Sequence, residues 1–200
     1  TGSNSDSGNF PAILDTAIKE SDWAGYDARK AASKARGKLR GIGFANAIER
    51  AASPSQPEYA EIRFNPSGTA MVLVGTKSQG QGHETLYKQI LNERLGLAPE
   101  DVKFIDGDTD RVAFGMGTNG SRSTVIGGGA AWTAADRIIE KGRKIAAHVL
   151  EASPQDVEFK AGQFSVRGTD KSLSLKEVAK TSFVLNKLPP GLEGGLFETA

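Results

Sequence analysis

The chain has 200 residues, of which 38% are hydrophobic and 24% charged, a composition that can bury a core and excludes a disordered tail. Its 25 basic and 24 acidic residues nearly cancel, so nucleic-acid binding through an overall positive field is not expected. The absence of cysteine excludes disulfides and iron–sulfur clusters within the chain, and the lack of a membrane-spanning apolar run favours a cytoplasmic protein without a membrane span.

The N-terminal part of the chain is predicted to be helical and then extended. Asn9 is placed as an N-cap before a helix that ends near Glu20, and the alanine-rich residues 28–35 predict a second helix. Between Leu39 and Ile48, bulky residues alternate with glycine and alanine, which predicts a strand with one nearly bare face.

The rest of the chain mixes hairpins with helices. It lacks the regular strand–helix–strand alternation of a doubly wound sheet, so we predict an α+β layered sandwich with mixed or antiparallel sheets. In chain order the predicted elements are a hairpin over 59–75, a helix ending at Gly96, a strand over 102–105, a long helix over 124–150, a hairpin over 157–166 and a helix capped by Ser174 and Glu177.

The first candidate binding loop runs from Gly75 to Thr85, between a strand and an amphipathic helix. Such a turn leaves backbone N–H groups free at a helix N-terminus, where a phosphate or another electron-rich ligand can bind. The carboxamides of Gln79 and Gln81 suit the edge of a heterocycle, whereas the P-loop and Rossmann fingerprints are absent. The alternatives are a plain turn with solvent-facing glutamines and, for His83, a cap or packing role.

The second candidate loop, 115–124, also leads into a helix. Hydroxyls from Ser121 and Ser123 and the guanidinium of Arg122 make a favourable arrangement for a pyrophosphate, although the serines can equally serve only as helix caps. Asp106–Asp110 does not fit a calcium loop, because its sixth and twelfth positions lack the required glycine and glutamate. The chain has only two histidines, no serine nucleophile elbow and no carboxylate pair with an evident acid/base role. We expect no metal ligand and no catalytic residue in it.

Taken together, Gly75–Thr85, Gly107–Asp110 and Gly117–Ser123 resemble, in order and spacing, the large subunit of molybdenum hydroxylases, a family that includes xanthine dehydrogenase, aldehyde oxidase and carbon monoxide dehydrogenase. The resemblance covers nearly the whole chain and is closest to the carbon monoxide dehydrogenase-like branch. It implies a molybdopterin-binding-domain fold and cofactor contacts from Gln79, Gly80, Gln81, Gly82, His83, Thr85, Thr118, Gly120, Ser121, Arg122 and Ser123.

The resemblance also implies a cofactor and partners. The family branch uses molybdopterin cytosine dinucleotide with molybdenum, oxidises a small molecule with oxygen from water, and passes electrons to 2Fe-2S and FAD centres on partner subunits or domains. The family's segment with the catalytic glutamate has no counterpart here, so the chain alone is expected to be inactive and largely unable to retain cofactor.

The resemblance further implies a division of the chain. Residues 1–35 are expected to be a helical lead-in, 36–183 the molybdopterin-binding domain, and 184–200 a truncated connection to a missing remainder of the large subunit. The residues alone leave two alternatives open. One is a stand-alone nucleotide- or phosphate-binding domain, and the other is an interaction scaffold in which the glycines only allow close packing.

Overall fold

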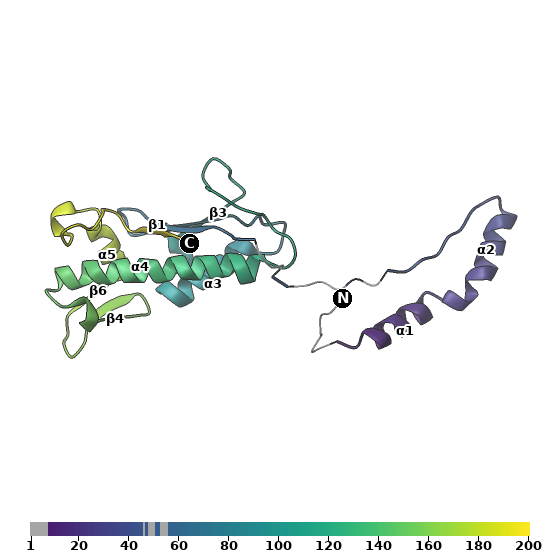
Figure 1. Ribbon diagram of the computed structural model, residues 1–200, viewed down its shortest axis with the longest axis horizontal. Coiled ribbons are helices and arrows are strands. Elements are labelled where there is room, and N and C mark those ends of the chain that lie inside the picture. The colour runs from purple at the N-terminus through teal and green to yellow at the C-terminus, as the bar shows by residue number, and fades with distance from the viewer. Residues whose placement is uncertain (1–7, 46, 48–50, 53–55) are drawn as a thin grey trace. The chain divides into compact units, whose positions relative to one another are not determined.

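The computed structural model describes residues 8–45, 47, 51–52 and 56–200. These residues form two units, the first ending at Ile48 and the second beginning at Glu49, each of which is described by itself (Figure 1). The sequence places a boundary earlier, after residue 35. No described helix combines the length and apolar character needed to cross a membrane.

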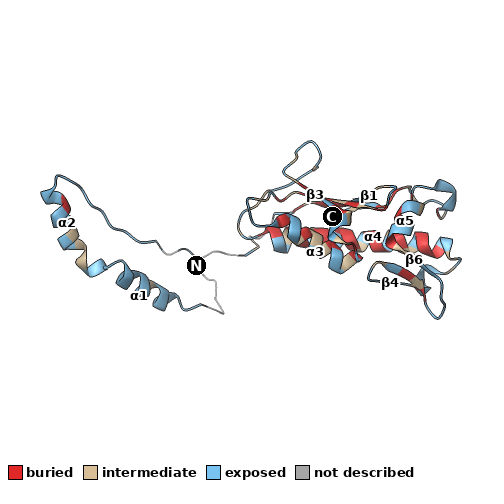
Figure 2. Cartoon of the chain, turned by 180° about the vertical axis from the view of Figure 1, so that it is seen from behind, coloured by how far each residue is buried: buried red, intermediate tan, exposed pale blue. Residues whose placement is uncertain are grey.

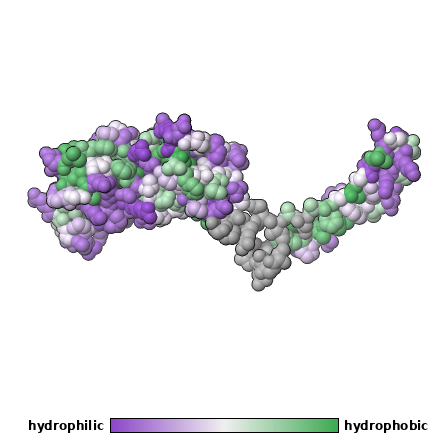
Figure 3. Space-filling view, turned by 45° about the horizontal axis from the view of Figure 1, so that its top comes forward, coloured by the Kyte–Doolittle hydropathy of each residue, from purple (hydrophilic) through white to green (hydrophobic). Residues whose placement is uncertain are grey.

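The N-terminal unit contains two helices, α1 (Phe10–Glu20) and α2 (Tyr26–Ala35). The predicted N-cap is confirmed, because the Asn9 side chain accepts a hydrogen bond from the Ala12 amide at 3.2 Å. No residue of α1 is buried, and Figure 3 shows apolar side chains on the surface of this unit.

The predicted strand over 39–48 is wrong for residues 39–45 and 47, which have no regular structure, while 46 and 48 lie outside the described residues. An alternating pattern becomes a strand only where a neighbour pairs with its backbone, and glycine adds an entropic cost. The segment stays exposed and meets the helical part of the unit at two points. Tyr26 donates to the Arg40 carbonyl at 2.8 Å, and the rings of Trp23 and Phe44 meet edge to face, 5.7 Å apart.

The second unit is built on a four-stranded mixed sheet in the order β3-β2-β1-β7. The predicted first hairpin is confirmed as an antiparallel pair, and β3 joins β2 in parallel. The bounds are β1 (Ala60–Phe64), β2 (Ala70–Val74), β3 (Val102–Asp106) and β7 (Phe197–Thr199).

The edge strand β7 was not predicted, since residues 184–200 were expected to be only a connection. It pairs antiparallel with β1, so this C-terminal segment completes the main sheet of the second unit. Three residues are too few to show a period of two, which is why the sequence gives no signal for this strand.

Two helices, α3 (His83–Leu95) and α4 (Gly128–Val149), pack on one face of this sheet (Figure 1). The even-numbered residues of β1 and β2 face the helices and form the core with them. Buried residues, red in Figure 2, also occur along the helices. The fully buried members of this core include Ile62, Val72, Val74, Tyr87, Leu91, Ala131, Ala134 and Ile138.

A smaller antiparallel sheet packs against the C-terminal half of α4. It contains β4 (Val157–Lys160), β5 (Gln163–Val166) and β6 (Ser172–Ser174), and α5 (Leu175–Thr181) follows it. Gly142 of α4 allows this approach, because a Cβ there would lie 2.6 Å from the Phe164 ring. The predicted second hairpin and the layered α+β class are therefore confirmed.

The long helix begins later than predicted, at Gly128 instead of Thr124. It is preceded by one turn of π-helix, Ser123–Gly127, which places an extra residue in the turn. A hydrophobic period cannot distinguish a wide turn from a regular one over so few residues. The π-turn begins within the second candidate loop, at Ser123.

The capping box at α5 provides a first prediction. Ser174 accepts from the Glu177 amide at 3.2 Å, and its own hydroxyl and amide donate to the Glu177 carboxylate, at 2.6 and 2.7 Å, lowering the pKa of Glu177. Ser174→Ala should therefore lower the free energy of unfolding by about 1 kcal/mol at pH 7. Because a lowered carboxyl pKa stabilises only above the unfolded-state value, the difference from wild type should narrow as the pH falls below the ordinary glutamate range.

Urea unfolding of the wild type and Ser174→Ala at neutral and acid pH checks this, with Ser172→Ala on the exposed part of β6 as a control. A gap between Ser174→Ala and wild type that does not change with pH would contradict the role given to the Glu177 carboxylate.

Candidate cofactor-binding site

The two candidate loops lie together on the surface of the second unit. Both line one hollow of about 530 Å3, beside the N-terminal end of α3 and the π-turn that leads into α4. The lining residues are Gln79, Gln81, His83 and Leu86 from the first loop and its helix, and Thr118, Asn119, Gly120, Ser121, Ser123 and Thr124 from the second. Seven of the eleven expected cofactor-binding residues therefore meet in this hollow.

The loops are in contact at Gly75, where the first loop leaves β2, and at Gly115, where the second loop begins. A Cβ built on either glycine would lie 2.5 Å from the Cα of the other, so the two backbones are in direct contact. The Gly117 amide also donates to the Gly75 carbonyl at 3.2 Å. Gly75 and Gly115 are thus explained by close packing of the two backbones.

Thr118 fastens the second loop to the first beyond this junction. Its hydroxyl donates to the Lys77 carbonyl at 2.6 Å and accepts from the Lys77 amide at 3.1 Å. The hydroxyl of Ser123 in turn donates to Thr118 Oγ1 at 3.0 Å. The two walls of the hollow are consequently held in register by hydrogen bonds between them.

The first loop presents bare backbone to its surroundings. Gly80 and Gly82 have φ of +101° and +78°, and a Cβ on either would have no atom within 4 Å. Gly82 is the N-cap of α3 and supplies no side-chain cap, so the first N–H groups of that helix stay available. Thr85 is exposed in the same turn but does not line the hollow. An anionic or polar ligand is favoured at such an end.

His83 gives an independent sign of a ligand. Its side chain is buried, at 4% exposure, and lines the hollow, yet Nδ1 has no hydrogen-bond partner in the described part of the chain. A buried ring nitrogen without a partner costs about 1–3 kcal/mol, and a ligand that hydrogen-bonds to it would offset this cost. The alternative of a helix cap is wrong, because no side chain caps α3.

A buried hydrogen-bond chain lies beneath the hollow. The Tyr87 hydroxyl is 3.0 Å from Thr76 Oγ1 and donates to the Ser123 carbonyl at 3.4 Å. Burial raises the pKa of Tyr87, so the phenol remains a donor at neutral pH. Gly127 leaves room for this hydroxyl, since a Cβ there would overlap it and lie 2.8 Å from Thr76 Cγ2.

Arg122 does not occupy the position predicted for it. Its side chain is 2% exposed and does not line the hollow. The guanidinium pairs with the Glu58 carboxylate and donates to the carbonyls of Gln56 and Pro57, at 2.8 and 2.9 Å. No local pattern connects residues so far apart, so the role of Glu58 could not be predicted from the sequence.

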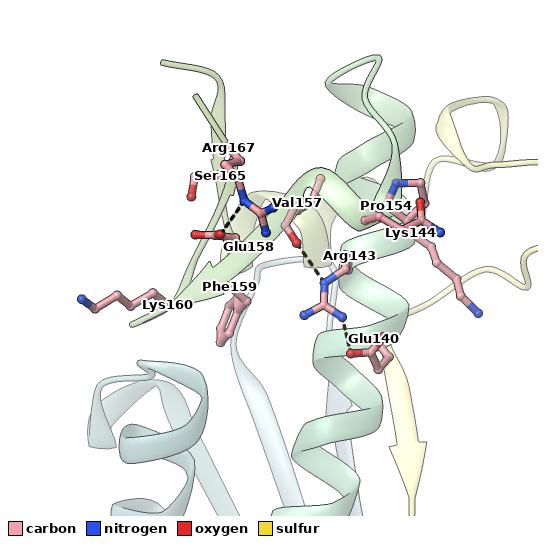
Figure 4. A pocket seen from close by; sticks show the side chains of 11 residues that line it. Glu140, Arg143, Lys144, Pro154, Val157, Glu158, Phe159, Lys160, Ser165 and Arg167 are labelled. Carbon is pink, nitrogen blue, oxygen red and sulfur yellow. Dashed lines mark hydrogen bonds and ion pairs between the residues drawn. The ribbon is translucent and has the colours of Figure 1, made fainter. Parts of the chain in front are cut away.

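A larger hollow, of about 770 Å3, lies between the C-terminal half of α4 and the β4–β5 hairpin (Figure 4). Its charged groups largely pair with one another: Arg143 with Glu140, and Arg167 with Glu158 at 2.9 Å. None of its lining residues holds a buried polar atom without a partner. The hollow between the two loops is therefore the stronger candidate for a binding site.

Sequence comparison shows the family of this chain. The sequence profile of the molybdopterin cofactor-binding domain matches residues 16–199. The chain belongs to this family of molybdenum hydroxylase large subunits. The resemblance drawn from the loops is thereby confirmed, and molybdopterin is the group that the site has to fit.

Several relatives show how much of a large subunit this molybdopterin-binding chain corresponds to. It is 40% identical to the carbon monoxide dehydrogenase large chain of Afipia carboxidovorans, over 96% of this chain and 26% of that one. It is 36% identical to the 6-hydroxypseudooxynicotine dehydrogenase complex subunit gamma of Paenarthrobacter nicotinovorans, over 87% and 22%. The crystal structure of a Cu,Mo-CO dehydrogenase superposes with a TM-score of 0.71 at 38% identity, covering 98% and 26%. The chain spans about a quarter of these relatives.

The donors of the hollow suit the organic part of a molybdopterin. They are carboxamides, hydroxyls, free backbone N–H groups and one unpartnered imidazole nitrogen, all of which bind heterocycle edges and phosphates. In the described residues, no group of three or more histidine, aspartate or glutamate side chains is placed to hold a metal ion. The residues present therefore fit the pterin and its phosphates through hydrogen bonds.

Proposed function

We propose that this chain holds molybdopterin, as the cytosine dinucleotide, in the hollow between its two glycine-rich loops. We infer further that it acts as part of the large subunit of a molybdenum-dependent hydroxylase, which oxidises a small molecule and passes electrons to 2Fe-2S and FAD partners. The observation that carries the binding site is the unpartnered Nδ1 of buried His83 in a hollow lined by both loops.

The two walls of the hollow would bind different parts of the cofactor. Gln79, Gln81 and His83 offer groups that match the edge of the pterin, and the N-terminal end of α3 supplies free N–H groups. Thr118, Gly120 and Ser121 form the other wall, which suits the phosphates of the dinucleotide. When bound, the cofactor supplies the redox chemistry of molybdenum, and the residues of this chain bind and orient it.

His83→Phe tests this assignment. In the complete enzyme, the phenyl ring should keep the burial but remove the hydrogen bond to the cofactor. We expect molybdopterin affinity to fall about tenfold or more, which corresponds to the loss of about 1.4 kcal/mol. Gln81→Ala should also lower the cofactor content. The measurement is the amount of pterin per protein chain after gel filtration.

Gln89→Ala is the matched control, because Gln89 is an exposed residue of α3 that does not line the hollow. It should leave the pterin content unchanged. Equal contents in wild type, His83→Phe and Gln81→Ala would rule out the hollow as the cofactor site. Release of a nucleotide without a pterin from the wild type would favour a nucleotide-binding domain instead.

A further inference from the structure

We propose that Glu58 and Arg122 are positioning residues, a buried ion pair that sets the second loop of the cofactor site without either residue contacting the cofactor. The expected effect on cofactor retention rests on the proposed function. Its structural part, the ordering of residues 116–123, can be tested without any cofactor.

The Glu58 carboxylate binds both the start of β1 and the second loop. Its side chain is fully buried, and it lies two residues before β1. One oxygen accepts from the amides of Tyr59 and Met116, at 3.1 and 3.3 Å, and the other pairs with Arg122. A single carboxylate thus ties the start of β1 to both ends of the loop that lines the hollow.

Arg122 completes the connection from the loop side. One guanidinium nitrogen pairs with Glu58 and lies 3.4 Å from the Gly117 carbonyl, and the other donates to the carbonyls of Gln56 and Pro57. Arginine suits this position because its planar fork directs donors on separate nitrogens to different acceptors, whereas all donors of lysine lie on one nitrogen. These contacts turn the guanidinium away from the hollow.

The position of Arg122 in the loop explains how the buried ion pair can order it. Its neighbours in the sequence, Ser121 and Ser123, both line the hollow, so a buried Arg122 fixes the side chains on either side of it. Gly120 and Ser121 also adopt left-handed backbone, with φ of +53° and +52°. Left-handed backbone is unfavourable for serine and persists only where surrounding contacts hold it.

Hydrogen exchange of the whole 200-residue chain tests the structural part. Glu58→Gln keeps the shape of the side chain but removes its charge. We expect the amides of residues 116–123 to exchange about tenfold faster, with no change at residues 79–85. Glu158→Gln is the control, because Glu158 forms an exposed ion pair with Arg167, and it should change neither loop. Unchanged exchange at 116–123 in Glu58→Gln would overturn the proposal.

Cofactor retention in the loaded, complete enzyme tests the consequence. The double variant Glu58→Leu with Arg122→Met removes both charges, so no buried charge is left unpaired and the chain should still fold. It should nevertheless release molybdopterin about tenfold faster than wild type, because the contacts that order the loop are gone. A wild-type release rate in the folded double variant would overturn the positioning role. If the wild type holds no pterin, the proposed function fails, while hydrogen exchange still decides whether the pair orders the loop.

Discussion

Gly75→Ala is expected to lower the free energy of unfolding of the second unit by about 3 kcal/mol, among the largest effects of adding a single methyl group to a packed interior. A Cβ at Gly75 would lie 2.5 Å from the Gly115 Cα and 2.6 Å from the Phe114 carbonyl oxygen, and it would overlap the Glu58 carboxylate. Two of these neighbours are backbone atoms, which cannot move aside by changing a rotamer. The strain would separate the two loops at the contact between Gly75 and Gly115.

Gly129→Ala is the matched control for this prediction. Gly129 lies in α4, and a Cβ there would have no atom within 4 Å outside its own helix and chain neighbours. Replacing it should stabilise the chain by about 1 kcal/mol, because alanine is the better helix former. Urea unfolding of both variants, followed by circular dichroism, provides the comparison. Destabilisation of equal size in both would show that Gly75 is not at a close backbone contact.

The glycines show which features of the site could be predicted from the sequence and which could not. Their clustering predicted two loops, and the structure confirms that both loops line one hollow. The sequence could not assign each glycine its role. Gly75 allows a backbone contact, Gly82 adopts positive φ before α3, and Gly127 makes room for a tyrosine hydroxyl. These roles depend on neighbours that are distant in the chain, and no single local pattern contains them.

Elements with a clear period were predictable, whereas pairing partners were not. The first hairpin and α3 were found because their apolar residues recur at fixed spacing. The segment 39–45 has such spacing but forms no strand, and β7 forms a strand without it. In both cases the outcome depends on whether a neighbouring strand is available to pair with the backbone.

The burial of Arg122 could not be inferred for a related reason. A guanidinium between two serines beside a helix start is typical of an anion site, and this pattern led to the expectation of a direct contact. Its direction depends on Glu58, a residue that precedes it by 64 positions in the chain. The cofactor-binding role of Arg122 thus becomes, in our proposal, an indirect one.

Arg122→Met is expected to lower the free energy of unfolding by about 3–5 kcal/mol, because it leaves the Glu58 carboxylate buried without its partner. Arg167→Met removes the arginine from a pair whose side chains are 65% and 58% exposed, and it should cost only about 0–1 kcal/mol. Both variants exchange the same side chains, so the difference in urea unfolding isolates the effect of burial. Similar losses in the two would contradict the buried ion pair.

The two large effects should also be coupled. Gly75→Ala pushes the Glu58 carboxylate out of the place in which Arg122 holds it, and Arg122→Met removes the group that holds it there. Once either substitution has displaced the carboxylate, the other substitution breaks fewer of its remaining contacts. The double variant should therefore lose less stability than the sum of the single losses, by about 1 kcal/mol or more. Strict additivity would mean that the junction of the loops and the ion pair act independently, and Glu58 would then not connect them.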